Sequence, residues 1–260
     1  MLPQIETITQ SLQKMGLIKD PREAAFHPLS GGVSSDIWRV DTPSGAICVK
    51  QARRQLRVDA KWLAPVERNS IEATWMRTTG ALMPGTVPRV ISEDRAASLF
   101  AMTYFDPGTY PTWISRLMSG DVDIDFAAEI GTQLARMHAA SADSPKLAAD
   151  FGHDDLFRAL RIDPYLITTS ERHRDIAARL RELAQTTLET RRTLIHGDVS
   201  PKNILVGPAG PVFLDAECAV YGDPAFDIAF CLNHLLLKCM ARRDSIHSLL
   251  ESYRCLAESY

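Results

Sequence analysis

The 260-residue sequence predicts an α+β protein in two parts, a strand-rich first third with one inserted helix and a mainly helical remainder. Short apolar runs between Phe26 and Lys50 are typical of strands, whereas apolar residues beyond Gly108 recur mostly at helical spacing. The breaker segment Asp106-Pro107-Gly108 separates the two patterns. Because 45% of the residues are hydrophobic, the chain can bury one large core or two small ones, which excludes a disordered tail.

The first part of the chain alternates helical and extended segments. Apolar residues at positions 5, 8, 12 and 15 recur at helical spacing and stop at Gly16. Two apolar runs flank the segment 41–45, whose Pro43 and Gly45 suit a hairpin connection. The expected segments are a helix over 5–15, strands over 36–40 and 46–50, a helix over 65–79 that ends at Gly80, an extended segment over 85–90 and a strand over 98–102.

The second part is expected to be mostly helical with one small hairpin. One amphipathic helix carries Ile130, Leu134, Met137 and His138 on a single face. Two apolar runs, over 203–206 and 211–214, flank a Gly-Pro-Ala-Gly turn and predict the hairpin. Further helices are expected over 171–188, 225–241 and 245–260.

Composition and charge exclude several classes of protein. A formal net charge of −3 supplies no general field for polyanions, so nucleic acid is not expected as a partner. Polar residues at 227, 233, 234 and 238 interrupt the apolar stretch 225–241, which predicts a buried helix rather than a membrane span. The N-terminus lacks the features of a signal peptide, which predicts a cytoplasmic protein. The five scattered cysteines predict neither a disulfide framework nor a zinc site.

The densest group of polar residues lies at 196–203 and is followed by Asp215. Phosphoryl transfer needs a carboxylate that takes or orients the proton of the nucleophile, and oxygen ligands that hold Mg²⁺ against the phosphates. Asp198, Asn203 and Asp215 are the candidates for these three roles. The His-x-Asp spacing, with Asn five residues after the Asp and an acidic residue after the next hairpin, matches a kinase catalytic loop.

On these residues the sequence resembles the aminoglycoside phosphotransferase and choline kinase-like family, small-molecule kinases with a protein-kinase-like fold. Gly197 stands where protein kinases usually carry Arg, and the segment 222–229 is similar to the family's segment after the metal-binding Asp. The resemblance covers nearly the whole chain. It implies an N-terminal nucleotide-binding lobe over 1–105, with an antiparallel sheet and one helix, and a mainly helical C-terminal catalytic and substrate-binding lobe over 106–260.

The Gly31-Gly32-Val33-Ser34 segment resembles the family's shortened nucleotide loop. It precedes a strand rather than a helix, which excludes a Rossmann fingerprint and a Walker A loop. Glycines let backbone N–H groups approach phosphate, although the motif by itself also fits a plain hairpin turn. Lys50 ends the next strand like the Lys that pairs with phosphate and a helix Glu in kinases, the alternative being a solvated strand end.

The resemblance also implies the remaining nucleotide contacts. Glu72 is expected to pair with Lys50, with Glu67 as the alternative. Met102 is expected to line the adenine pocket, while the Thr103 carbonyl and the Phe105 N–H meet the adenine edge. An ordinary core strand would carry the same side chains. The implied cofactors are ATP, or GTP, and Mg²⁺.

Three further features have a structural interpretation beside a functional one. Asp227 either braces the catalytic loop, as the resemblance implies, or caps the helix that it opens. His138 is expected to be a hydrogen-bonded core histidine rather than a ligand. The acidic run 121–125 lacks the Gly and Glu of a calcium loop and is expected to be a solvated loop and helix N-terminus.

The function implied by the resemblance is transfer of the γ-phosphoryl group of ATP to a hydroxyl of a small molecule, such as an amino sugar or amino alcohol. A cationic acceptor would call for carboxylates around Asp198, and the candidates are Asp150, Asp154, Asp155, Asp163 and Glu217. Many relatives continue beyond helix 245–260 with helices that wall the acceptor pocket, so this pocket is expected to be open or to need further chain.

Two alternatives to a small-molecule kinase are weighed. One is a nucleotide-binding module without transferase activity, which Asp198 disfavours because a pure binder needs no base. The other is a protein kinase, which is disfavoured because the segment between Asp215 and Asp223 is too short for an activation loop. The oligomeric state stays open.

Overall fold

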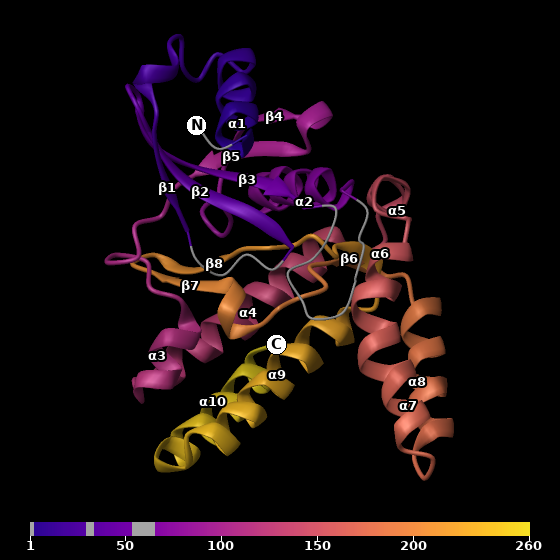
Figure 1. The fold of residues 1–260 in the computed structure, drawn as a ribbon. Coiled ribbons are helices and arrows are strands. Elements are labelled where there is room, and N and C mark those ends of the chain that lie inside the picture. The colour runs from indigo at the N-terminus through magenta and orange to yellow at the C-terminus, as the bar shows by residue number, and fades with distance from the viewer. Residues whose placement is uncertain (1–2, 30–33, 54–65) are drawn as a thin grey trace. The chain divides into compact units, whose positions relative to one another are not determined.

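The computed structural model describes residues 3–29, 34–53 and 66–260, and it divides the chain into two compact units (Figure 1). Unit 1 comprises Met1–Gly80 and Pro88–Phe105, and unit 2 comprises Ala81–Val87 and Asp106–Tyr260. Unit 1 holds one antiparallel sheet with helices, and unit 2 is mainly helical with two small two-stranded sheets. The predicted α+β class is therefore confirmed.

The strands of unit 1 form one sheet in the order β1-β2-β3-β5-β4, and every neighbouring pair is antiparallel. The strands are β1 (Ala25–Pro28), β2 (Ser35–Thr42), β3 (Gly45–Ala52), β4 (Val90–Asp94) and β5 (Leu99–Thr103). Thr42 lies opposite Gly45, so the predicted hairpin is confirmed, with Pro43 and Ser44 as its two-residue turn. Strand β4 shares only Val90 with the predicted extended segment 85–90, so that prediction is wrong for 85–89. The Ser-Glu-Asp end of β4 has low strand propensity and is held at a sheet edge, which is why the sequence did not predict it.

Helix α1 (Pro3–Lys14) packs on the sheet of unit 1, as its apolar spacing predicts. Ile8 and Leu12 are fully buried in one cluster with the strand residues Val40 and Val49. The buried apolar face, rather than intrinsic helix propensity, is what stabilises a helix of this length.

Helix α2 (Arg68–Leu82) runs through Gly80, so the helix end predicted at that residue is wrong. One interior glycine costs a helix only about 1 kcal/mol, which burial of a large side chain exceeds. Trp75 is fully buried and Met76 nearly so, and this packing anchors the helix before the glycine.

Unit 2 is built from helices and two short strand pairs. Its α-helices are α3 (Trp113–Ser119), α4 (Ile124–Ser141), α5 (Pro145–Asp150), α6 (Asp155–Phe157), α7 (Thr168–Arg172), α8 (Ala177–Glu189), α9 (Pro224–Ala241) and α10 (Ile246–Ser259), with a π-helix, η3 (Arg158–Ile167), between α6 and α7. Its strand pairs are β6 (Thr193–Ile195) with β9 (Val220–Gly222), and β7 (Ile204–Gly207) with β8 (Gly210–Phe213). The β7–β8 pair confirms the predicted hairpin.

The single helix predicted over 171–188 is wrong, because the chain turns between α7 and α8. Residues 173–176 carry no Gly or Pro and their side chains are exposed, and their backbone forms a turn in which Ile176 N donates to His173 O. Packing of α7 and α8 against each other and against η3 decides this turn. Local propensity does not reveal such tertiary contacts.

Helix α9 is only partly buried, whereas its apolar sequence predicts a buried helix. Cys231 and Leu235 are buried, but Leu236, Leu237 and Met240 are exposed. A helix that is apolar all round gives no sequence signal for which face is covered. Among the described residues, α9 alone has the length and mean hydropathy, 1.2, that would allow a membrane span, and a single such helix is weak evidence for one.

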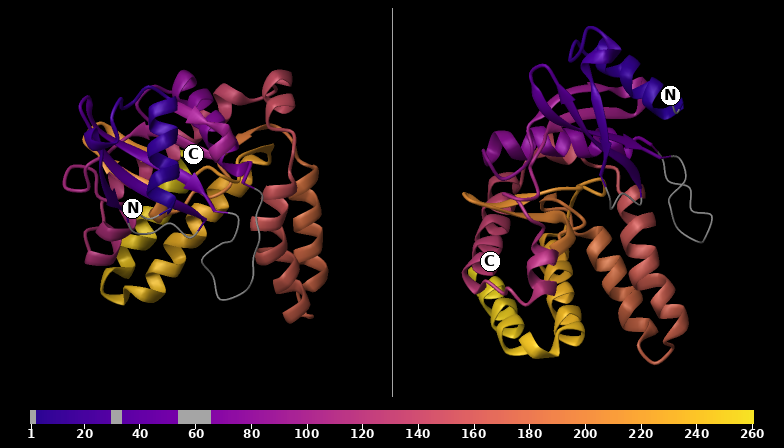
Figure 2. Two further views of the ribbon diagram at one scale, coloured as in Figure 1. Left: turned by 45° about the horizontal axis from the view of Figure 1, so that its top comes forward. Right: turned by 60° about the vertical axis from the view of Figure 1, so that its left-hand side comes forward.

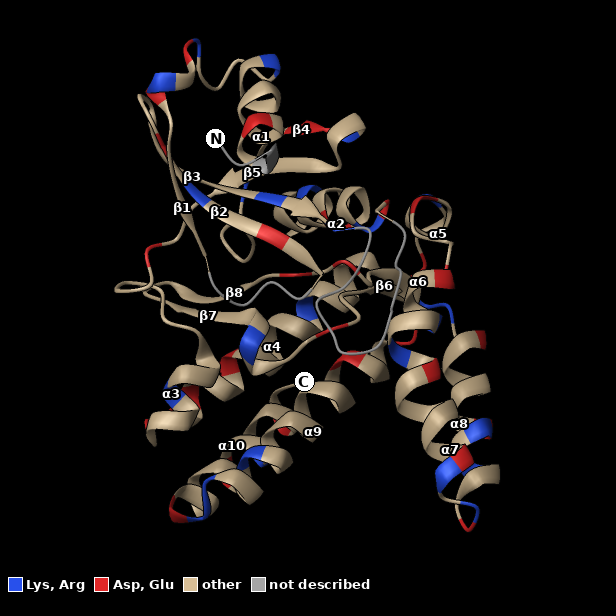
Figure 3. Cartoon of the chain, in the orientation of Figure 1, with Lys and Arg blue, Asp and Glu red and all other residues tan. Residues whose placement is uncertain are grey.

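Charged residues of both signs are interspersed along the helices (Figure 3). In α10, for example, Arg254 pairs with Glu251 and Glu258, at 2.5 Å in each case. Exposed pairs of this kind contribute little stability, about 0–1 kcal/mol each, so the fold depends on its apolar contacts instead.

Helix α10 packs against both α4 and α9 (Figure 2). Gly131 of α4 allows the closest approach, because a Cβ atom at this position would lie 2.3 Å from the Leu256 carbonyl oxygen of α10. Any larger residue at 131 would therefore force the two helices apart.

We expect Gly131→Ala to destabilise the fold by about 1–3 kcal/mol, as overpacking of a filled core does. Helix propensity alone would give the opposite sign, a gain of about 0.5–1 kcal/mol. Chemical denaturation measures the difference. Arg136→Ala, on the exposed face of the same helix, is the control and should change stability by less than about 0.5 kcal/mol. A Gly131→Ala protein at least as stable as wild type would show that the close contact is absent.

Candidate active site

Lys50 and Glu72 form a buried ion pair in unit 1. The Lys50 Nζ atom lies 2.6 Å from Glu72 Oε2, and the side chains are only 3% and 1% exposed. Lys50 stands on β3, and Glu72 on α2, while Glu67 is exposed at the start of that helix. The structure therefore pairs Lys50 with Glu72 and excludes the solvated strand end as an interpretation of Lys50.

A buried ion pair is a poor source of stability, because removing two charges from water costs about as much as their attraction returns. Apolar residues of similar size would serve the fold as well. Lys50 and Glu72 are thus better explained by a role for the ammonium group than by a role in folding.

The other predicted nucleotide residues of unit 1 are placed only in part. Gly31, Gly32 and Val33 lie outside the described residues. The Ser34 carbonyl accepts a hydrogen bond from the Arg53 N–H at 3.0 Å. Met102 is buried on β5 opposite Cys48 of β3, Thr103 is the last residue of β5, and Phe105 is the last residue of unit 1. Their contacts with adenine stay predictions.

Asp198 of unit 2 is almost buried, and three donors converge on its Oδ2 atom. They are Asn203 Nδ2 at 2.8 Å, Arg161 Nη2 at 2.9 Å and Lys202 Nζ at 3.3 Å. No described residue donates to the Oδ1 atom, which is the carboxylate oxygen left for a further hydrogen bond. The Asn203 amide nitrogen also donates to the Asp198 carbonyl at 3.0 Å, so its side-chain oxygen is the end that could bind a metal.

The backbone of the loop that carries Asp198 is hydrogen-bonded to the side chain of Asp227, which is fully buried on α9. Its two oxygens accept the backbone N–H groups of His196 at 2.7 Å and Gly197 at 2.8 Å. The helix is capped instead by Asp223, whose Oδ1 accepts the Ala225 N–H. The expected brace is thus the role that Asp227 has in the structure.

His138 completes this buried network. Its Nδ1 lies 2.8 Å from the Tyr260 hydroxyl and its Nε2 lies 3.3 Å from Asp227 Oδ2, which confirms the expected core histidine. Burial raises the pKa of Asp227, but the hydrogen bond with His138 and the backbone N–H of His196 outweigh burial and lower it. The carboxylate is therefore ionised in the folded protein at neutral pH.

His196 joins the Asp198 loop to the segment that carries Asp215. Its Nδ1 accepts the Asp198 N–H at 3.1 Å and its Nε2 donates to the Leu214 carbonyl at 2.9 Å, an arrangement that only a neutral ring allows. Burial also lowers the pKa of His196. Leu214 N in turn donates to the Asn203 carbonyl at 2.8 Å. Asp215 is therefore attached directly to the loop that holds Asp198 and Asn203.

Asp215 has a backbone φ of +66°, in the left-handed region that residues other than glycine seldom adopt. Such a conformation costs of order 1–3 kcal/mol and is concentrated at functional sites. Glycine would remove the strain but would also remove the carboxylate. The presence of Asp at this position therefore indicates that the carboxylate is retained despite the cost of the backbone strain.

The donor set of unit 2 fits Mg²⁺ bound together with phosphate. Asp215 offers a carboxylate and Asn203 an amide oxygen, and the described residues contain no cluster of three His, Cys, Asp or Glu side chains that could hold a metal by themselves. Mg²⁺ is usually held in this way, by one or two protein oxygens plus substrate phosphates.

Two residues that contact Asp198 were not predicted. Lys202 follows Asp198 by four residues, and this spacing within the loop was a usable signal. Burial lowers the pKa of Lys202, but the Asp198 and Asp215 carboxylates raise it above its ordinary value. Arg161 lies far upstream on η3, and nothing in its local sequence points to the loop.

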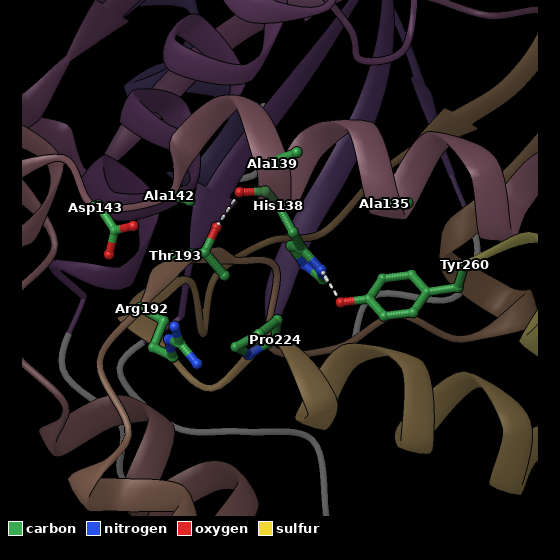
Figure 4. Close-up of a pocket in the computed structure, with 9 residues that line it drawn as sticks. All are labelled: Ala135, His138, Ala139, Ala142, Asp143, Arg192, Thr193, Pro224 and Tyr260. Atoms are coloured by element: carbon green, nitrogen blue, oxygen red, sulfur yellow. Dashed lines mark hydrogen bonds between the residues drawn. The ribbon is translucent and has the colours of Figure 1, made fainter.

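A pocket of about 310 Å³ lies beside His138 and Tyr260 in unit 2 (Figure 4). Its remaining lining residues are Ala135, Ala139, Ala142, Asp143, Arg192, Thr193 and Pro224. None of the predicted catalytic, metal or nucleotide residues is among them.

The sequence profile of the phosphotransferase enzyme family matches residues 25–256. The chain belongs to the phosphotransferase enzyme family. The match includes the whole segment from Lys50 to Asp227, and it confirms the family resemblance carried by the catalytic loop.

Curated relatives of the chain are methylthioribose kinases. Methylthioribose kinase 1 of Oryza sativa subsp. japonica is 28% identical over 233 residues, which cover 77% of this chain and 53% of the rice protein. A methylthioribose kinase of Bacillus cereus is 22% identical over 270 residues, which cover 94% of this chain and 68% of that protein. The chain thus spans about half the length of the rice relatives that it matches.

Solved structures with the same fold include two phosphotransferases. A choline/ethanolamine kinase family protein from Mesorhizobium loti has a TM-score of 0.59 at 16% identity, covering 95% of this chain and 76% of that chain. An aminoglycoside phosphotransferase from Streptomyces rimosus has a TM-score of 0.56 at 16% identity, covering 99% of this chain and 92% of that chain. These likenesses confirm the predicted protein-kinase-like fold.

We expect Asp227→Asn to lower the free energy of unfolding at pH 7 by about 1–3 kcal/mol, because an amide cannot accept from both backbone N–H groups. The pKa of Asp227 is lowered in the folded state, so its carboxylate stabilises the fold above the unfolded pKa of about 4. That contribution is lost as pH falls through the folded-state pKa, and the gap between wild type and variant should shrink in acid. Urea unfolding between pH 3 and 8 measures it.

Asp223→Asn is the matched control, since Asn and Asp cap helices about equally well. It should leave stability within about 0.5 kcal/mol of wild type at every pH. A pH-independent difference for Asp227→Asn would count against a buried carboxylate that supports the loop.

Proposed function

We propose that the protein transfers the γ-phosphoryl group of ATP, or GTP, to a hydroxyl group of a small molecule. The observation that carries this proposal is the braced loop of unit 2, which holds Asp198 and Asn203 together and is tied to Asp215 through Leu214. A base, an amide oxygen and a carboxylate in this order are the groups that phosphoryl transfer requires.

In the proposed reaction the acceptor oxygen forms a bond to the γ-phosphorus while the bond to the βγ-bridging oxygen breaks. The nucleoside diphosphate leaves with that electron pair, and the acceptor proton passes to Asp198. The Oδ1 atom would accept it, because the three donors on Oδ2 hold the carboxylate in one orientation. Catalysis by such a site is mainly positioning and charge stabilisation.

The predicted residues would bind different parts of the nucleotide. Lys50 would meet the α- and β-phosphates while Glu72 orients its ammonium group, and Gly31 to Ser34 would cover the phosphates. Met102, Thr103 and Phe105 would contact adenine. Asn203 and Asp215 would hold Mg²⁺, which neutralises charge on the phosphates when bound.

The relatives support a small-molecule acceptor. The curated relatives are named methylthioribose kinases, enzymes whose name gives a small sugar as the acceptor. An aminoglycoside phosphotransferase with the same fold, with a TM-score of 0.51 and 16% identity, has been solved with streptomycin and ATP. A nucleotide-binding module without transferase activity would not need the carboxylate of Asp198.

The experiment that tests the proposal is an ATP-consumption screen of the purified protein with Mg²⁺ across amino sugars, amino alcohols, nucleosides and sugars. Mass detection of a phosphorylated product, formed one for one with ADP, is the expected result. ATP binding without any product across the whole screen would contradict the proposal and favour the binding module.

We expect Asp198→Asn to reduce turnover by about 100- to 10,000-fold and to leave Mg-ATP affinity nearly unchanged, because its carboxylate addresses the acceptor. Asp215→Ala should behave differently and weaken Mg-dependent nucleotide binding itself. Calorimetry with Mg-ATP and steady-state kinetics separate the two effects. Wild-type turnover in Asp198→Asn, or unchanged Mg-ATP affinity in Asp215→Ala, would remove that residue from its assigned role.

We expect Lys50→Met to weaken Mg-ATP binding about 10- to 150-fold, the effect of one charge-assisted contact worth about 1.5–3 kcal/mol. It should also destabilise the fold by about 3–5 kcal/mol, since the buried Glu72 carboxylate would lose the Lys50 ammonium group. The double variant Lys50→Met/Glu72→Gln removes both charges and should recover stability. Its affinity for Mg-ATP should stay low. A double variant that binds Mg-ATP as wild type does would show that Lys50 serves the fold alone.

A further inference from the structure

Two cations share the carboxylate that would meet the acceptor hydroxyl. Arg161 Nη2 and Lys202 Nζ lie 2.9 and 3.3 Å from the same oxygen of Asp198. One carboxylate balances only one of these charges. A cationic acceptor approaching Asp198 would therefore meet like charge at hydrogen-bond distance from the reacting group, which is unfavourable.

The guanidinium of Arg161 is held by hydrogen bonds to backbone carbonyls, and one of these follows from the local sequence. Pro164 has no N–H for the carbonyl four residues earlier, Leu160 O, and the chain here forms the π-helix η3. Arg161 Nη1 donates to that oxygen at 2.7 Å, and Arg161 Nε donates to Gly197 O at 2.8 Å. Such a guanidinium is positioned before any ligand arrives.

The guanidinium still has hydrogen-bonding capacity. Of its five N–H groups, three are used by Leu160, Gly197 and Asp198. Within the part of the chain that the structure describes, this leaves one N–H on each terminal nitrogen of Arg161. Paired donors on a planar fork match the oxygens of a carboxylate or phosphate.

Most of the carboxylates that a cationic acceptor would need form ion pairs with other basic side chains. Asp150 pairs with Lys146 at 3.1 Å, Asp154 with Arg191 at 2.7 Å and Asp163 with Arg158 at 3.6 Å, and Asp155 is exposed. Glu217, the remaining member of the expected set, is buried, and its charge acts on Arg161. Burial lowers the pKa of Arg161, yet nearby acidic groups, Asp198 and Glu217 among them, raise it.

Helix α9 adds further basic groups and an aromatic wall. Burial lowers the pKa of His234, Asp198 opposes this, and the cations Lys238, Lys202 and Arg161 lower it further. The Phe230 ring lies 6.0 Å from the Arg161 guanidinium carbon and 4.9 Å from the His234 ring. The surroundings of Asp198 on this side are thus basic and aromatic.

We propose that the hydroxyl acceptor carries an anionic group, a carboxylate or a phosphate, and that Arg161 and Lys202 bind this group beside Asp198. The inference rests on the proposed phosphotransferase function and names its substrate class. It replaces the amino sugars and amino alcohols expected from the sequence. The anion would accept the N–H groups of Arg161 that Leu160, Gly197 and Asp198 leave over.

Two sets of probes that differ in charge but share a carbon skeleton test this. One set is glycerol, glycerate, glycerol 3-phosphate and 2-amino-1,3-propanediol, and the other is glucose, gluconate, glucose 6-phosphate and glucosamine. With Mg-ATP, we expect kcat/KM for the anionic members to exceed that for the neutral and amine members by about 10-fold or more. Preference for the carboxylates or for the phosphates identifies which anion the site takes.

The outcomes separate this inference from the function on which it depends. Product from the neutral or amine members at equal or higher kcat/KM would overturn the anionic acceptor and leave the phosphotransferase intact. ADP formation without a phosphorylated product in either set would contradict both.

Arg161→Met and Lys202→Met then test the residues. Each should lower the ratio of kcat/KM for the anionic acceptor to that for its neutral analogue by about 10-fold, mainly through a higher KM. The ratio does not depend on the fraction of folded protein, so it remains informative if Arg161→Met is unstable. A residue that only positions Asp198 would lower kcat for every acceptor alike and leave the ratio unchanged, which would overturn the assignment.

Arg158→Met is the matched control, because Arg158 stands on the same π-helix and pairs with Asp163 on the exposed side. Its ratio should equal that of wild type. If the kcat/KM ratio falls in this variant as much as in Arg161→Met, the effect comes from positive charge in general. That result would overturn the specific role of Arg161.

Discussion

The buried carboxylate of Asp227 is the constraint on which the catalytic loop depends. It accepts the backbone N–H groups of His196 and Gly197, and His138 links it to the Tyr260 hydroxyl. Helices α4, α9 and α10 thereby meet at one charged group. The loop is held by the core of unit 2 rather than by its own short sequence, and a site held in this way needs little reorganisation when it acts.

Both units place charged groups in low-exposure positions with their partners already present. In unit 1 the Lys50 ammonium is oriented by Glu72, and in unit 2 Asp198 is oriented by Asn203, Arg161 and Lys202. Such pairs contribute little to stability but fix direction and charge. Asp215 is similar, because its positive φ costs conformational free energy while it fixes the direction of the side chain.

The sequence predicted what depends on local spacing and failed where distant contacts decide. The β7–β8 hairpin and the loop motif with Asp198 and Asn203 follow from short patterns, whereas Glu72 as the partner of Lys50 was implied by the family resemblance. The break between α7 and α8 and the exposed face of α9 depend on packing, which no window of sequence records. Arg161 was missed for the same reason, because only the fold brings η3 to the catalytic loop.

The central proposal is that the braced loop of unit 2, which carries Asp198 and Asn203, binds a Mg-bound nucleotide. Hydrogen-exchange mass spectrometry tests it directly, with rising concentrations of a non-hydrolysable ATP analogue in the presence of Mg²⁺. We expect peptides over 196–217 in unit 2 to gain protection as the concentration of the analogue rises. No gain in protection over 196–217 at saturating analogue would contradict a nucleotide bound at this loop.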